Sequence, residues 1–427
     1  MKLIVTPSKI CGIAEVPGSK SHTIRGVISA MLTNGTSILH APLQSADTVS
    51  ALNAAEKLGA SFKVAPDGSW HIKGFGDSNP QPDGVIDLGN SGTSLRLLSA
   101  AASLFDHEIK FDGDDSLRSR PMDSLLKALE MLGAETTSTS GKAPLSVKGP
   151  LKGGRCTVSG VTSQYLSALL FAAPFAPQDT IIELESLNEQ PYVRMTLKWL
   201  DFLGIKYQAA ENLLHFEIKG NQKFKPFEKT IPADFSTSLF VLGAALQSGA
   251  DSGVEIKNLD FSDSQGDKEV FQFFERSGAI IEYGKTVHIP AGQKLQGGKF
   301  DLNNVPDALP IFSAVCASIK GTETHCLNVP QARLKETDRI ECMTRELRKM
   351  GADIDELADG MFIRGRQLHG SNELESYGDH RIAMALAVAA LNADSPSIIN
   401  GIECAAVTFP DFVRQFQKLG ADFKVID

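Results

Sequence analysis

The chain has 427 residues, is 42% hydrophobic and 22% charged, and carries a formal net charge of −9 at pH 7. This composition is ordinary for a globular protein, and the length favours two or three domains. The acidic balance argues against nucleic acid or a membrane surface as a general partner.

Targeting and metal-binding patterns are missing from the sequence. The N-terminal stretch "MKLIVTPSKICGI" lacks the apolar core of a signal peptide. The apolar run at 382–391 is far shorter than the roughly 20 residues that span a bilayer. The six cysteines are scattered without a CxxC pair, so neither a zinc site nor a disulfide framework is indicated. We therefore expect a soluble cytoplasmic protein with free thiols and no metal.

Taken in chain order, the predicted elements repeat. Six amphipathic helices, such as those within 123–134 and 338–352, are each expected to end at a glycine, which supplies a left-handed C-cap. Successive glycines of this set are 69 to 74 residues apart, and such a period is typical of an internal repeat. The six glycines are Gly59, Gly133, Gly204, Gly278, Gly351 and Gly420.

A second helix, rich in small apolar residues, is predicted in every repeat. These helices are apolar on nearly all sides and should be buried. A short extended segment follows most of the amphipathic helices. We therefore predict an α/β fold with two similar domains, each made of three strand-and-two-helix units. A helical solenoid is the alternative, but its common repeats are shorter. The buried helices are expected at 23–33, 93–105, 164–176, 236–246, 309–318 and 380–391.

Polar clusters stand at the N-terminal ends of these apolar helices, for example "GSKSHTIR" and "LGNSGTSLR". Helix N-termini favour phosphates and carboxylates, and arginine grips both bidentately. Most of these clusters, taken alone, are better explained as an N-cap or a turn, whereas their recurrence at equivalent points of the repeat favours an anion site. The cations expected to line it are Lys20, Arg25, Arg96, Arg120, Lys335, Arg339 and Arg381.

Together, the motifs "PGSKS", "LGNSGT", "RSRPM", "SQYLSALL", "PDALP", "LKETDRI", "GDHRIAMA" and "TFPDF" resemble the 5-enolpyruvylshikimate-3-phosphate synthase family over essentially the whole chain. The resemblance implies the inverse α/β barrel of enolpyruvyl transferases. It implies a discontinuous domain of residues 1–19 and 233–427, a second domain of residues 20–232, and an active site in the cleft between them. The first strand would then belong with the C-terminal half.

The resemblance also implies the reaction. The enolpyruvyl group of phosphoenolpyruvate would pass to the 5-hydroxyl of shikimate 3-phosphate, with release of phosphate, in the shikimate pathway of aromatic amino-acid biosynthesis. It implies no cofactor, no metal and a monomer.

The expected site residues are carried over by position. Asp307 would act as base at the reacting hydroxyl, Glu336 and Lys20 would move protons at the methylene carbon, and His380 would support them. Shikimate 3-phosphate would be held by Lys20, Ser21, Arg25, Thr162, Ser163, Gln164, Asp307, Gln331 and Lys335. Phosphoenolpyruvate would be held by Lys20, Asn90, Gly92, Thr93, Arg120, Gln164, Arg339 and Arg381.

Three positions depart from the family pattern. Thr162 replaces the first serine of a Ser-Ser-Gln motif, which is a conservative change. Glu189 stands where a substrate-binding serine precedes the "PY" dipeptide, which puts a carboxylate near an anionic substrate. Val407 stands where some members have a lysine before "TFPDF", so one cation on the phosphate side is missing.

Two other functions are possible for a chain with these motifs. UDP-N-acetylglucosamine enolpyruvyl transferase shares the fold but typically has a reactive cysteine in the loop that reads "DDSLRSRP" here. A catalytically idle paralogue that serves as a binding protein would explain Glu189 and Val407, yet Lys20, Asp307 and Glu336 are all present.

Overall fold

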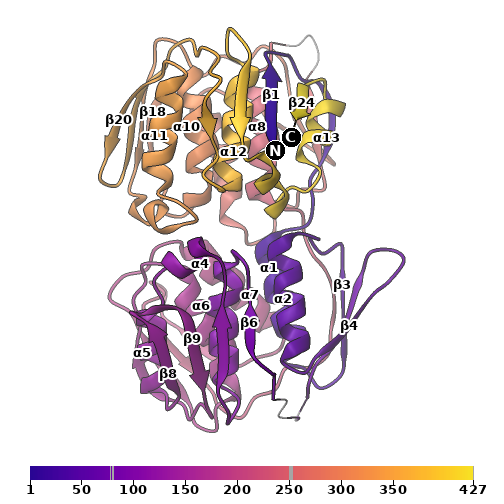
Figure 1. The fold of residues 1–427 in the computed structure, drawn as a ribbon, viewed down its shortest axis with the longest axis vertical. Helices are drawn as coiled ribbons and strands as arrows, with labels where there is room; N and C mark the ends of the chain where they lie inside the picture. Colours follow the sequence, from indigo (N-terminus) through magenta and orange to yellow (C-terminus); the bar gives the residue numbers. More distant parts are fainter. Residues whose placement is uncertain (77, 79–80, 250–252, 427) are drawn as a thin grey trace. The chain divides into compact units, whose positions relative to one another are not determined.

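The computed structural model describes residues 1–76, 78, 81–249 and 253–426. The chain packs as two compact units, each with its own hydrophobic core (Figure 1). Unit 1 consists of Met1–Pro17 and Pro232–Asp427, and unit 2 consists of Gly18–Ile231.

One repeat of unit 2 shows the plan of the others. Strand β6 (Val85–Asp87) leads into the inner helix α3 (Gly92–Ala102) and then into the parallel strand β7 (Ile109–Asp112). After the short helix α4 (Asp115–Ser119), the outer helix α5 (Asp123–Met131) leads to the hairpin β8 (Glu135–Thr139) and β9 (Lys142–Lys148). Because β9 pairs with β7 antiparallel, the sheet order is β6-β7-β9-β8.

Two further repeats are continuous in sequence and have the same sheet order. In unit 2 the elements are β10 (Gly154–Thr157), α6 (Ser163–Ala172), η1 (Ala173–Phe175), β11 (Thr180–Glu183), α7 (Gln190–Phe202), β12 (Tyr207–Ala209) and β13 (His215–Ile218). In unit 1 they are β18 (Gly298–Asp301), η3 (Pro306–Ala308), α10 (Leu309–Ser318), β19 (Glu323–Leu327), η4 (Pro330–Leu334), α11 (Arg339–Lys349), β20 (Asp353–Leu357) and β21 (Gly360–Arg364).

Two repeats take their first strand from a distant part of the chain. In unit 2, β14 (Glu228–Thr230) pairs in parallel with β3 (Thr36–His40). That repeat also contains α1 (Lys20–Met31), α2 (Ala46–Lys57), β4 (Ser61–Val64) and β5 (Trp70–Lys73). In unit 1, β2 (Gly12–Glu15) pairs in parallel with β15 (Val254–Lys257). That repeat also contains α8 (Phe235–Gln247), η2 (Gly266–Lys268), α9 (Glu269–Arg276), β16 (Glu282–Tyr283) and β17 (Val287–Ile289).

The last repeat is completed by the N-terminal strand. Strand β1 (Lys2–Thr6) lies between β23 (Ser397–Asn400) and β24 (Asp422–Ile426), antiparallel to both. In Figure 1, β1 and β24 accordingly lie side by side. The prediction that the first strand belongs with the C-terminal half is therefore confirmed. The other elements of this repeat are β22 (Leu374–Glu375), α12 (His380–Leu391), η5 (Ile402–Val407) and α13 (Phe412–Lys418).

The six predicted C-cap glycines end six equivalent outer helices, which are α2, α5, α7, α9, α11 and α13. Their φ angles lie between 75° and 105°, in the left-handed region that glycine enters without cost. The residue after each glycine donates its N–H to the carbonyl oxygen of the residue five positions earlier, which is the 6→1 bond of the Schellman motif. Examples are Ala134 to Leu129 at 3.0 Å and Ile205 to Leu200 at 2.9 Å. The repeat and its helix ends are confirmed.

The apolar helices form the inside of each unit, as predicted. In unit 2, α3 contacts both α1 and α6, and in unit 1, α8, α10 and α12 contact one another. Small residues permit this close packing. A Cβ atom added to Gly243 on α8 would lie 2.9 Å from the side chain of Ile311 on α10. None of the helices in the described part of the chain is long and apolar enough to cross a membrane.

The strand content of each repeat was underestimated, because the sequence predicted a single extended segment where the structure has four strands. The described strands are only two to seven residues long. Strands this short carry too few alternating positions to be recognised from periodicity.

Candidate active site

The predicted site residues lie at or near the N-terminal ends of inner helices and in the segments that lead into outer helices, and we describe them as one group in each unit. The unit 2 group comprises Lys20, Ser21 and Arg25 on α1, Asn90, Gly92 and Thr93 at the start of α3, Arg120 after α4, and Thr162, Ser163 and Gln164 at the start of α6. The unit 1 group comprises Asp307 in η3, Gln331 in η4, Lys335 and Glu336 after η4, Arg339 at the start of α11, and His380 and Arg381 at the start of α12.

In the unit 2 group, Lys20 is held by a carboxylate. Its Nζ lies 3.1 Å from Oδ2 of Asp47, and both side chains are largely buried. Asp47 lies in the first turn of α2, where the helix dipole favours a negative charge. This pair fixes the direction of the Lys20 ammonium.

Two guanidinium groups approach the start of α3. Arg120 donates from Nη2 to Oδ1 of Asn90 and to Oγ of Ser116. A Cβ atom at Gly92 would lie 2.7 Å from Nη1 of Arg120 and 3.1 Å from Nη1 of Arg96. Glycine is therefore required at position 92 for the two cations to lie against this helix N-terminus.

The start of α6 is joined to the same region. Nη1 of Arg96 donates to Oε1 of Gln164 at 2.7 Å, and its guanidinium lies 5.6 Å from the ring centre of Tyr165. Thr162 is the N-cap of α6 and accepts the N–H of Gln164. The structure thus brings Gln164 together with Arg96, which the sequence had named only as a lining cation.

Glu189 also reaches the start of α6. Its Oε2 accepts hydrogen bonds from Oγ of Ser163 at 2.8 Å, from N of Ser163 at 3.2 Å and from Oγ1 of Thr162 at 3.3 Å. The residue that was noted as a departure from the family pattern therefore contacts the residues expected to hold shikimate 3-phosphate.

Arg25 is directed into the interior of unit 2. It is 1% exposed and donates to Oγ1 of Thr196 at 3.0 Å and to the carbonyl oxygens of Ser21 and Tyr192. Burial lowers the pKa of its guanidinium to about 10, and the interaction with Tyr192 opposes this shift. These contacts tie α1 to α7, so Arg25 fixes the packing of α1 against α7.

In the unit 1 group, Arg339 is the centre of an ionic network. It is 1% exposed, and its Nε lies 2.7 Å from Oδ2 of Asp379, which is fully buried. Its Nη1 lies 2.8 Å from Oδ1 of Asp307, and its Nη2 lies 2.6 Å from Oε2 of Glu336. Burial opposes the charge of Arg339, but Asp379, Glu336 and Asp307 outweigh it and raise the pKa above its ordinary value.

Asp307 joins three cations. Its Oδ2 lies 3.0 Å from Nη2 of Arg381, and its Oδ1 lies 3.9 Å from Nζ of Lys335, in addition to the contact with Arg339. Burial would raise the pKa of Asp307, but the charges of Arg381, Lys335 and Arg339 hold it well below its ordinary value. Asp307 is therefore held as an ionised carboxylate.

The remaining predicted residues of unit 1 lie at the edge of this network. His380 is buried at the start of α12, with its Nδ1 3.9 Å from Oδ1 of Asp379. Gln331 is buried and donates to the carbonyl oxygen of Asn303 at 2.8 Å. Val407 is the half-buried last residue of η5.

Three acidic residues that hold the site were not identified from the sequence. Asp47 pairs with Lys20, Asp379 pairs with Arg339, and Asp114 accepts from Nδ2 of Asn90 at 2.7 Å. Asp114 and Asp379 are themselves N-caps, of α4 and α12, and Asp47 is in a first turn. The only sequence pattern that could have identified these three residues is an acidic residue next to a helix start. That pattern is equally typical of ordinary helix capping, so it does not indicate a functional site.

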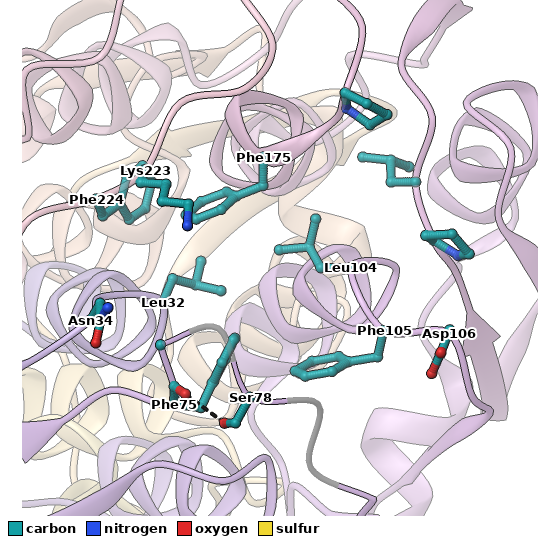
Figure 2. A pocket seen from close by; sticks show the side chains of 14 residues that line it. Leu32, Asn34, Phe75, Ser78, Leu104, Phe105, Asp106, Phe175, Lys223 and Phe224 are labelled. Atoms are coloured by element: carbon teal, nitrogen blue, oxygen red, sulfur yellow. Dashed lines mark hydrogen bonds between the residues drawn. The ribbon is translucent and has the colours of Figure 1, made fainter.

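A cavity of about 510 Å³ lies elsewhere in unit 2, near the C-terminal ends of its inner helices. Figure 2 shows the rings of Phe75, Phe105 and Phe175 around it, with Leu32 and Leu104. None of the predicted site residues is among the described residues that line it. In the described part of the chain, no group of three or more His, Cys, Asp or Glu side chains is arranged to hold a metal ion.

A profile of the family described as EPSP synthase (3-phosphoshikimate 1-carboxyvinyltransferase) matches residues 4–416. The chain belongs to the EPSP synthase family. It is 47% identical to the 3-phosphoshikimate 1-carboxyvinyltransferase of Acetivibrio thermocellus and 44% identical to that of Ruminiclostridium cellulolyticum, and each comparison covers 100% of both chains.

The solved structures agree with this family assignment. The EPSP synthase of Acinetobacter baumannii is 25% identical, covers 100% of both chains and gives a TM-score of 0.83. The two-domain inverse α/β fold that the family resemblance implied is therefore confirmed.

Proposed function

We propose that this chain transfers the enolpyruvyl group of phosphoenolpyruvate to the 5-hydroxyl of shikimate 3-phosphate and releases phosphate. The observation that carries the proposal is the unit 1 network, in which the ionised carboxylate of Asp307 lies among Arg339, Arg381 and Lys335. Family membership and relatives of this name over the full chain support it.

The reaction needs one proton acceptor and one proton donor. The hydroxyl oxygen forms a bond to C2 of phosphoenolpyruvate, the hydroxyl proton leaves, and C3 gains a proton, which gives a tetrahedral adduct. C3 then loses a proton while the bond between C2 and the phosphate oxygen breaks. We assign the hydroxyl proton to Asp307 and the proton at C3 to Glu336 and Lys20, with His380 supporting them.

The pairing of cations with carboxylates suits this chemistry. Arg339 and Arg381 both contact the carboxylate of Asp307. An anionic substrate that binds these arginines takes over part of their charge, which would raise the pKa of Asp307 and make it a stronger base. Binding of phosphoenolpyruvate would thus activate the proton acceptor.

The interdomain cleft implied by the family resemblance stays a prediction, as do the two predicted domain boundaries.

The substrate assignments follow the two groups. We assign phosphoenolpyruvate to Arg120 and Asn90 as well as to Arg339 and Arg381, because bidentate guanidinium groups suit its carboxylate and phosphate. The donors at the start of α6 are assigned to shikimate 3-phosphate. The remaining proposed contacts to phosphoenolpyruvate are Gly92, Thr93 and Gln164. The remaining proposed contacts to shikimate 3-phosphate are Ser21, Arg25, Gln164, Gln331 and Lys335.

Release of inorganic phosphate from phosphoenolpyruvate tests the proposal directly. We expect release with shikimate 3-phosphate and none with UDP-N-acetylglucosamine or without an acceptor. Release only with the UDP-sugar would identify the cell-wall enzyme, although α4 and its flanks contain no cysteine. No release with either acceptor would identify an idle paralogue. A monomeric state and a cytoplasmic location stay predictions, and light scattering after size-exclusion chromatography tests the former.

A further inference from the structure

A carboxylate occupies the N-terminus of α6. Glu189 is 1% exposed, and its Oε2 accepts from the backbone N–H and the hydroxyl of Ser163 and from the hydroxyl of Thr162, at 2.8 to 3.3 Å. A carboxylate at this position gains from the free N–H groups and from the partial positive charge of the helix end.

Ordinary helix capping does not require this contact. α6 already has its own N-cap, because Thr162 accepts the N–H of Gln164. The inner helices α8 and α12 are capped by the aspartates directly before them, Asp234 and Asp379. At α6, by contrast, a second acceptor is brought from 26 residues away in the chain.

The backbone around Glu189 is arranged to deliver this side chain. Glu189 has φ 57° and ψ 38°, a left-handed conformation that is uncommon for residues other than glycine and asparagine. The neighbouring loop is fixed by the N–H of Asn188, which donates to the carbonyl oxygen of Gly160 at 2.9 Å. The N–H of Tyr192 donates to the carbonyl oxygen of Glu189 itself at 3.0 Å. Strained backbone held in this way is typical of functional positions.

A bound phosphate monoester would need the same donors. Thr162 and Ser163 are the residues that we assign to shikimate 3-phosphate, and both of their hydroxyl groups and the N–H of Ser163 donate to the Glu189 carboxylate. Two anions that share one set of donors repel each other strongly in a poorly solvated position. The carboxylate and a phosphate group therefore exclude each other there.

We propose that Glu189 is an internal anion that occupies the acceptor's phosphate position at the start of α6 and must withdraw when the phosphorylated acceptor binds. This inference rests on the proposed function for the identity of the acceptor. Glu189 thereby sets the affinity for shikimate 3-phosphate and leaves the affinity for phosphoenolpyruvate unchanged. It is a specificity-determining residue and takes no part in proton transfer.

The test compares Glu189→Gln and Glu189→Ser with Glu185→Gln. Glu185 is exposed on the same loop, so its variant removes one charge without touching α6. Calorimetric titration with shikimate 3-phosphate alone is expected to show a dissociation constant lower by about tenfold or more for Glu189→Ser. Glu189→Gln should change in the same direction by less, and Glu185→Gln should match the unchanged chain. The KM for phosphoenolpyruvate should stay the same in all three.

A merely structural role predicts the opposite pattern. If Glu189 only stabilises the loop, both variants lower the melting temperature and bind shikimate 3-phosphate equally well or more weakly, and the proposal is wrong. Adding Ser163→Ala to Glu189→Ser should abolish the gain, because it removes one of the freed donors. A gain that survives this change would place the effect elsewhere and overturn the proposal.

Inorganic phosphate separates this inference from the proposed function. If the unchanged chain releases no phosphate from phosphoenolpyruvate with shikimate 3-phosphate, the proposed function fails. Titration with inorganic phosphate still decides the role of Glu189, because Glu189→Ser and Ser163→Ala change only the groups at the start of α6. Phosphate bound by the arginines assigned to phosphoenolpyruvate is common to all the variants and cancels in the comparison. Tighter phosphate binding by Glu189→Ser, lost again with Ser163→Ala, supports the internal anion, and equal binding overturns it.

Discussion

At the scale of single residues, several cations of the site are paired with carboxylates of the chain itself. Lys20 contacts Asp47, Arg339 contacts Asp379, and Arg381 contacts Asp307. Isolated buried charges would be expensive, so these cations need partners within the protein. Asp379 is fully buried and also accepts the N–H of Arg381, so its contact with Arg339 is fixed. Asp307 is partly exposed, so it is the carboxylate of this network whose protonation can change during the reaction.

The first prediction concerns the proton acceptor. Asp307→Asn removes the acceptor and should lower turnover by about 100-fold or more, since general base catalysis contributes roughly that much. The change also releases Arg381, Arg339 and Lys335 from a negative charge. Binding of phosphoenolpyruvate should therefore be as strong as before or stronger. Steady-state kinetics and titration measure the two effects separately.

A matched control for this variant is Asp355→Asn. It removes an exposed carboxylate of β20 that is paired with Arg364 of β21. Its turnover should stay at the level of the unchanged chain. Near-normal turnover of Asp307→Asn would rule out the assigned role of Asp307.

The second prediction concerns Val407, where some family members have a lysine. Val407→Lys should strengthen the binding of phosphoenolpyruvate by up to about 3 kcal/mol, the value of a charge-assisted hydrogen bond. Shikimate 3-phosphate alone should bind as before, because the added charge belongs to the side of the other substrate. Val407→Met controls for side-chain length without charge. If the lysine variant binds phosphoenolpyruvate no better than the methionine variant, position 407 does not face the phosphate.

The sequence allowed the residue types of the site to be predicted, but their partners could not be. Lys20 and Asp47 are 27 positions apart, and Arg339 and Asp379 are 40 positions apart. Such pairs depend on how helices pack, and no local spacing rule reports them. Glu189 illustrates the limit, because its substitution was visible in the sequence while its contact with α6 was not.

At the scale of elements, helix ends were more predictable than strands. A C-cap glycine acts through the backbone of its own turn, so the positions of Gly59 and the five related glycines were sufficient. A strand of two to four residues depends on its neighbours in the sheet, as β16 depends on β17. The four-stranded sheets therefore appeared only in the structure.

The third prediction tests the left-handed cap itself. Gly204 has φ 75°, is exposed, and has open space where a Cβ atom would lie. Gly204→Ala should therefore destabilise the chain by about 1 kcal/mol through backbone strain alone. Gly204→Asn is the matched control, because asparagine tolerates this conformation. Urea unfolding should rank the stability Gly above Asn above Ala. Equal stability of the alanine and asparagine variants would show that strain at φ is not the cause.

At the scale of the whole molecule, the chain does not complete its repeats in sequence order. Unit 2 is a continuous segment, Gly18–Ile231, while unit 1 needs Met1–Pro17 as well as Pro232–Asp427. The 70-residue period predicted six equivalent repeats, and family resemblance predicted that the first strand joins the C-terminal half. Strands β2 and β14 each begin a repeat whose other elements lie far away in sequence. Periodicity could not predict this, because the 70-residue period is carried by the helices.

The last prediction follows from this arrangement. Residues 1–17 bury Leu3, Val5 and Ile10 in the core of unit 1, and β1 is the strand that bridges β23 and β24. Each such side chain contributes about 1.5–3 kcal/mol by burial, so the loss of the segment is comparable with the whole stability of a domain. A chain of residues 232–427 alone should therefore lack cooperative urea unfolding.

A circular permutation supplies the control. Lys2 is paired with Ile426, and paired Cα atoms in antiparallel strands are only about 5 Å apart. A linker of about four residues can therefore join residue 427 to residue 1. The permuted chain 232–427–linker–1–17 should then unfold cooperatively, and so should residues 18–231 alone. Equal unfolding midpoints with and without residues 1–17 would show that β1 and β2 are dispensable, and an unfolded permuted chain would show that unit 1 depends on unit 2 for its stability.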